Sequence, residues 1–75
     1  MAVWCRQVVD GVAVDEPWRI EPVDPADTDA DLLARKRSSA SGKGWSVEVT
    51  GPDSFTATKD RWGGALCVRE FWVAP

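Results

Sequence analysis

Two closely spaced apolar runs at the start of the chain predict a β-hairpin. The run Val3–Val9 is rich in β-branched and aromatic residues, and a second run, Val12–Val14, follows it. Between them, Asp10-Gly11 supplies the positive φ angles that a two-residue type I′ turn requires. We therefore predict a first hairpin over about Val3–Trp18.

Prolines limit the next segment to a short edge strand and a connector. Pro17, Pro22 and Pro25 each lack an amide hydrogen and cannot donate to a sheet ladder. The stretch Trp18–Ile20 is therefore predicted to form no more than a short edge strand.

A helix is predicted after this connector, and two starts compete for it. Asp24 can cap a helix with Pro25 at its first position, whereas Thr28 can cap one with Asp31 three residues later. Acidic residues then precede basic ones, the order that the helix dipole favours. The apolar stripe at helical spacing consists of Ala26, Ala30, Leu33 and Ala40.

The end of the helix is marked by a change of period. The segment 38–44 is rich in serine and glycine, and Gly42 or Gly44 can take the left-handed C′ position. From Trp45 to Thr50, apolar and polar residues alternate. This alternation predicts a strand with one buried face.

The remaining sequence predicts two further strands. A dense turn signal at 50–54 leads into a strand over Phe55–Lys59, and a loop at 60–64 leads into Leu66–Val73. The last strand is apolar on both faces, which predicts a central position or cover on both sides. The order ββαβββ predicts a single small α+β domain over 1–75, a two-layer sandwich with one helix packed on a mainly antiparallel sheet.

Composition narrows the possible chemistry. A chain of 75 residues has a thin core, and it contains neither histidine nor tyrosine, so it lacks the commonest general base and any Ser-His-Asp or Cys-His arrangement. We expect no enzymatic activity and no catalytic, cofactor or metal site. Without a membrane span or a secretion leader, we expect a soluble cytoplasmic protein. Cys5 and Cys67 are then buried thiols, with a disulfide or redox role as the alternative.

Charge is segregated along the sequence. Residues 10–31 hold eight acids and one base, whereas 35–75 hold seven bases and four acids. The acidic run Asp15–Asp31 either imitates nucleic-acid phosphates, docks on a basic partner, or is a solvated connector and helix start. The candidate nucleic-acid contacts are Arg35, Lys36, Arg37 and Lys43.

Five tryptophans are too many for so small a core to bury. Trp45 is predicted to point inward and to pack against Trp4 or Trp72. Exposed tryptophan beside arginine is typical of binding hot spots, although such residues can also cap the ends of a core. The candidate contacts to a partner are Trp18, Arg19, Arg61 and Trp62.

The C-terminal third resembles small accessory proteins of actinobacterial phages and prophages. The segments that carry the resemblance are Gly44-Trp45-Ser46-Val47, Thr50-Gly51-Pro52, Ser54-Phe55-Thr56-Ala57-Thr58-Lys59 and Arg69-Glu70-Phe71-Trp72-Val73. The resemblance implies an accessory protein that acts on host machinery or defence.

These observations leave three hypotheses about function. The first is a non-enzymatic phage-type protein that binds a host protein and modulates its activity. The second is a nucleic-acid-associated protein that uses the basic end of the helix. The third is a homo-oligomeric structural or virion component with tryptophans in a symmetric interface.

Overall fold

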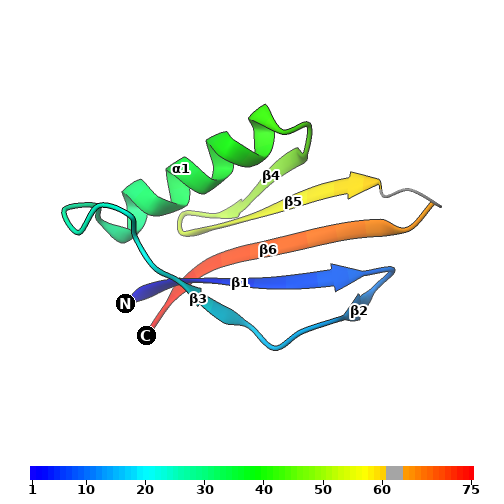
Figure 1. The fold of residues 1–75 in the computed structure, drawn as a ribbon, viewed down its shortest axis with the longest axis horizontal. Helices are drawn as coiled ribbons and strands as arrows, with labels where there is room; N and C mark the ends of the chain where they lie inside the picture. The colour runs from blue at the N-terminus through cyan, green and yellow to red at the C-terminus, as the bar shows by residue number, and fades with distance from the viewer. Residues whose placement is uncertain (61–63) are drawn as a thin grey trace.

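One helix packs on an antiparallel sheet in the residues that the computed structural model describes, 1–60 and 64–75 (Figure 1). The elements are β1 (Ala2–Val9), β2 (Val12–Ala13), β3 (Trp18–Ile20), α1 (Asp29–Gly42), β4 (Ser46–Gly51), β5 (Ser54–Asp60) and β6 (Leu66–Ala74). Within these residues the strands form one six-stranded sheet. The predicted two-layer α+β architecture is confirmed.

The two longest strands lie side by side in the middle of the sheet. The strand order is β2-β1-β6-β5-β4, and β3 also pairs with β1. The pairing of β1 with β6 runs from Ala2 opposite Ala74 to Val9 opposite Cys67. The predicted central position of the last strand is confirmed, and both ends of the chain lie together (Figure 1).

The first turn follows the prediction, but the strand after it is shorter than predicted. Asp10 and Gly11 have φ angles of 51° and 81°, as a type I′ turn needs. The chain leaves the sheet after Ala13 and returns as β3, which pairs with β1 from Ile20 opposite Val3. Pro17 lies in the gap between these strands, where a residue without an amide hydrogen costs no ladder bond.

The helix begins at the later of the two predicted starts. The Thr28 hydroxyl accepts from the Asp31 amide at 3.1 Å, and the Asp31 carboxylate accepts from the Thr28 amide at 3.2 Å. This reciprocal capping box satisfies two amides that the first turn leaves unpaired. The start at Asp24 is wrong, because its carboxylate accepts from the Ala26 amide in a separate turn. Gly44, with φ of 86°, takes the left-handed position after the helix.

The core is small and lies between α1 and the sheet. Its buried residues are Val3, Cys5, Leu32, Leu33, Phe55, Ala57 and Phe71. The predicted apolar stripe is only partly right, because Ala26 precedes the helix and Ala30 is exposed. Leu32 and Leu33 are instead the buried helix residues, so two neighbouring leucines hold α1 on the sheet.

The predicted contact of Trp45 with Trp4 or Trp72 is wrong. Trp45 packs against the core on the helix side, whereas Trp4 lies directly opposite Trp72 on neighbouring strands. Val3 and Cys5 take the inward positions of β1, so period-two alternation turns Trp4 to the other face. Trp45 therefore lies on the helix side of the sheet, and Trp4 and Trp72 lie on the other.

Candidate functional site

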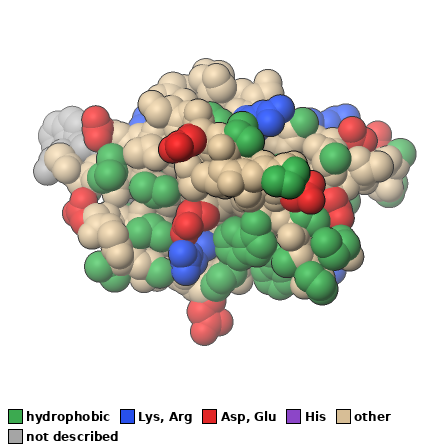
Figure 2. Space-filling model, turned by 180° about the vertical axis from the view of Figure 1, so that it is seen from behind, with side chains coloured by type: hydrophobic (Ala, Val, Ile, Leu, Met, Phe, Trp, Pro, Cys, Tyr) green, Lys and Arg blue, Asp and Glu red, His purple; other side chains and the backbone are tan. Residues whose placement is uncertain are grey.

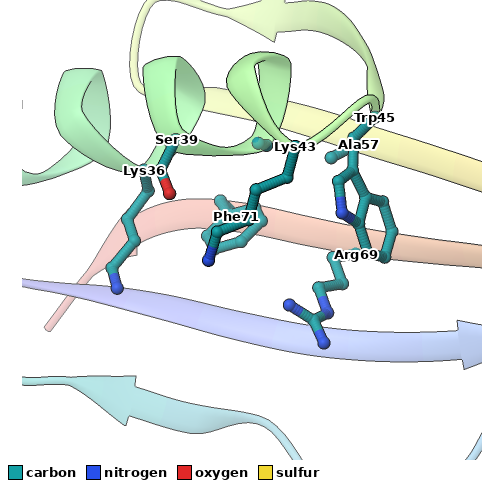
Figure 3. Close-up of a pocket in the computed structure, with 8 residues that line it drawn as sticks. Lys36, Ser39, Lys43, Trp45, Ala57, Arg69 and Phe71 are labelled. Atoms are coloured by element: carbon teal, nitrogen blue, oxygen red, sulfur yellow. The ribbon is translucent and has the colours of Figure 1, made fainter.

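Basic and aromatic side chains line a pocket between α1 and the helix-facing side of the sheet. The pocket has a volume of about 100 Å³. Lys36 extends from α1 and Lys43 from the position directly after it, Arg69 extends from β6, and Trp45 closes one end from the loop that follows the helix. Figure 3 shows the charged ends of Lys36, Lys43 and Arg69 directed away from α1, toward β1.

A second hollow continues the pocket toward β3. It has a volume of about 240 Å³, shares Lys36 and Arg69 with the first, and adds Trp18 and Arg19. We call the combined surface the basic groove. It is defined by Trp18, Lys36, Lys43, Trp45 and Arg69, while Arg19 borders the second hollow from a strand position opposite Trp4, which faces away from α1.

Trp45 organises the positive charges at one end of the groove. The Arg69 guanidinium carbon lies 4.9 Å from the centre of the indole ring, and the Lys59 Nζ lies 5.8 Å from it. Lys59 also donates to the backbone carbonyl of Lys43 at 3.3 Å. Cation–π attraction holds the cations against the ring. The ring therefore already has charged neighbours and is not a free platform for stacking a nucleobase.

The groove brings cations together without a balancing acid. Among the residues described, Lys36, Lys43 and Arg69 form no ion pair, and the buried Nε of Arg69 has no hydrogen-bond acceptor. No acidic side chain in segments 1–60 and 64–75 lines either hollow. Because like charges repel, a bound anion would stabilise this arrangement.

Acidic residues limit the length of the groove. A neighbouring hollow shares Lys36 with the groove but is also lined by Glu21 and Asp27. Arg19 itself forms a salt bridge with Glu21 at 3.4 Å. The positive surface is therefore short and ends in negative charge near β3 and the start of α1.

The four candidate nucleic-acid contacts do not form one surface. Lys36 and Lys43 line the groove. Arg35 instead forms a salt bridge with Asp27 at 3.1 Å, and Arg37 is exposed on α1 without lining the groove. The helical twist separates these neighbours, because consecutive residues lie about 100° apart around the axis.

The four candidate partner contacts fall into two groups. Trp18, which is 40% exposed, lines the end of the groove beside β3, and Arg19 borders the same hollow. Arg61 and Trp62 lie outside the described residues. Sequence reasoning missed Arg69 as a groove residue. Arg69 could have been recognised from the sequence pattern, because it is a charged residue two positions before the buried Phe71 and therefore faces inward on the same strand.

The two cysteines are buried free thiols and do not form a disulfide. Cys67 lies opposite Val9, four residues along β1 from Cys5. At the usual rise of a strand this separation is about 13 Å, beyond the roughly 7 Å between Cα atoms that a disulfide spans. This spacing excludes a disulfide between Cys5 and Cys67 within the chain.

We predict that Cys5 makes stability fall in alkaline solution. Burial, the largest cause, raises the pKa of the Cys5 thiol from 9.0 to about 11, although Arg69 and Lys36 oppose this shift. The unfolded thiol loses its proton above pH 9 while the folded one keeps it, so the free energy of unfolding should fall as pH rises from 9 toward 11.

Chemical denaturation at a series of pH values checks this effect. The decline above pH 9 should be smaller in Cys5→Ala than in the unsubstituted protein, even if the substitution lowers stability at all pH values. Parallel pH profiles for the two proteins would contradict the prediction.

The described part of the chain contains neither a metal-binding cluster nor a membrane-spanning helix. These residues contain no group of three or more candidate metal ligands, and no helix among them is long and apolar enough to cross a membrane. Comparisons with protein-family models, curated proteins and solved structures find no match. The resemblance to actinobacterial phage proteins therefore stays a prediction.

Proposed function

We propose that the protein is a non-enzymatic binding module that holds an acidic segment of another protein in the basic groove. The observation that carries the proposal is the convergence of Lys36, Lys43 and Arg69 without an acidic lining residue. Carboxylates pair well with such cations, and Arg69 can bind a carboxylate through two parallel hydrogen bonds. In the phage context that the resemblance implies, the partner is a cytoplasmic host protein whose activity is modulated by this binding.

The tryptophans support a peptide ligand with apolar as well as acidic side chains. Trp18 offers exposed aromatic surface at the open end of the groove. Tryptophan and arginine are enriched in the residues that contribute most to protein–protein binding. A segment that alternates acidic and apolar residues would match this lining.

An acidic peptide fits the groove better than a nucleic-acid strand does. A nucleic acid carries one phosphate per nucleotide, and its backbone would meet Glu21 and Asp27 beyond the end of the groove. The chain as a whole also has a net charge of −3, which repels a long polyanion. The nucleic-acid hypothesis is therefore the alternative outcome of the binding experiment.

Fluorescence anisotropy with a labelled peptide of alternating glutamate and leucine tests the proposal. Binding should weaken with added salt, and a peptide with glutamine in place of glutamate should bind much less. Lys36→Gln and Arg69→Gln should each weaken binding by about tenfold or more, because hydrogen bonds to charged groups contribute about 1.5–3 kcal/mol.

Arg37→Gln is the matched control. It removes the same charge from the neighbouring position of α1 but lies outside the groove, so affinity should stay within about twofold. Equal losses in Lys36→Gln and Arg37→Gln would show that only net charge matters and would contradict the proposed site. Tighter binding of a short oligothymidine than of the peptide would favour the nucleic-acid alternative.

A further inference from the structure

The face of the sheet opposite α1 carries large apolar side chains without a covering layer in the described structure. Its central rungs pair β1 with β6, and the outward-facing partners are Trp4 with Trp72, Arg6 with Glu70 and Val8 with Val68. Leu66, at the end of β6, is 43% exposed. Figure 2 views the molecule from behind and shows this face, with hydrophobic side chains on both sides of adjoining acidic and basic groups.

An ion pair lies at the centre of this uncovered face. Arg6 donates to the Glu70 carboxylate from Nε at 2.9 Å and from Nη2 at 2.6 Å. The side chains of Arg6 and Glu70 are 43% and 34% exposed, so both remain accessible to another molecule. The central charges sum to zero, and apolar rungs flank them along both strands.

This arrangement is complementary to itself. Consider a two-fold axis that lies in the interface between the two copies, parallel to the strands and above the line midway between β1 and β6. This axis would set Arg6 of each copy over Glu70 of the other. The same axis would place the Trp4–Trp72 rungs of the two copies against each other. Two sheets commonly pack face to face in this way, about 10 Å apart and with their strands roughly aligned.

The broad side of the molecule is large enough to hold an interface of standard size. The molecule measures 40 × 25 × 22 Å, and standard interfaces bury about 800 Å² per partner. A second copy would also cover the apolar side of a sheet that α1 covers on one side alone.

We propose that two copies of this chain pack face to face through the uncovered side of the sheet, with Arg6 of each copy paired to Glu70 of the other. The basic grooves then point outward on both sides of the dimer. The interface and the grooves lie on opposite faces of the sheet. A test of the dimer is therefore independent of a test of the proposed peptide binding.

Sedimentation over a range of concentrations tests the dimer directly. The unsubstituted protein should shift from 8.2 kDa to twice that mass as concentration rises. Arg6→Glu alone makes the central charges acidic, and Glu70→Arg alone makes them basic, so each variant should associate at least about a hundredfold more weakly with itself. Mixing the two variants should restore a one-to-one complex, because an acidic face then meets a basic one.

Three controls separate the interface from folding and from net charge. Circular dichroism reports whether the single variants are folded, and the double variant Arg6→Glu with Glu70→Arg keeps the pair within the chain and should dimerise. Arg37→Glu makes the same charge change on α1 and should leave the dimer intact. A monomer at all concentrations, or a dimer unaffected by both single reversals, would overturn the proposal.

Discussion

Phe55→Ala is expected to remove most of the stability of the protein. Phe55 is 1% exposed and stacks on Phe71 with the ring centres 4.5 Å apart. Truncating a buried phenylalanine typically costs about 3–5 kcal/mol, because burial is lost and a cavity remains. A domain of this size has a total of roughly 4–11 kcal/mol, so the variant should be partly unfolded in water or nearly so.

Urea denaturation followed by circular dichroism measures this loss. Val49→Ala provides the control, because Val49 lies directly opposite Phe55 on β4 but is 58% exposed. Its free energy of unfolding should change by no more than about 0.5 kcal/mol. Similar midpoints for the two variants would show that the stacked phenylalanines do not form the centre of the core.

Leu32→Ala is expected to loosen the helix from the sheet. Leu32 and Leu33 are the buried residues of α1, and truncating a buried leucine costs about 2–5 kcal/mol. Few other apolar contacts hold the helix, so its amides should exchange with solvent sooner than those of β6. Because Lys36 lies on α1 and Lys43 directly follows it, affinity for the acidic peptide should fall as well.

Hydrogen exchange and peptide titration of the same sample check this expectation. Val23→Ala is the control, since Val23 precedes the helix and is 96% exposed. It should leave both the exchange of α1 and the peptide affinity unchanged. Faster exchange spread evenly over α1 and β6 in Leu32→Ala would contradict a separately loosened helix.

Local chemistry made much of the fold predictable from sequence. Asp10-Gly11 encodes its turn because few other residues accept two successive positive φ angles. Thr28 and Asp31 encode the helix start through hydrogen bonds between near neighbours. Such signals depend on residues close in sequence, so they can be recognised without knowledge of the tertiary structure.

The parts that sequence could not predict depend on contacts between distant segments. Trp4 lies on the face of β1 away from the helix. The register of β1 with β6 and the position of α1 determine this placement. The groove brings Lys36 from α1 to Arg69 from β6, and no local pattern indicates that meeting. Arg35 was a reasonable candidate beside Lys36 until the fold brought Asp27 within reach of it.

The pairing of β1 with β6 has a consequence for how the chain folds. Arg6 and Glu70 are 64 positions apart, yet they are direct neighbours at the centre of the sheet. Closing so long a loop costs entropy before the contacts it permits can offset that cost, and such topologies fold slowly for their size. The hairpin of β4 and β5 can form early, but it has no neighbour on the β6 side until Leu66–Ala74 joins it. Because β5 and β6 are also close in sequence, the late step should be the entry of β1 beside β6.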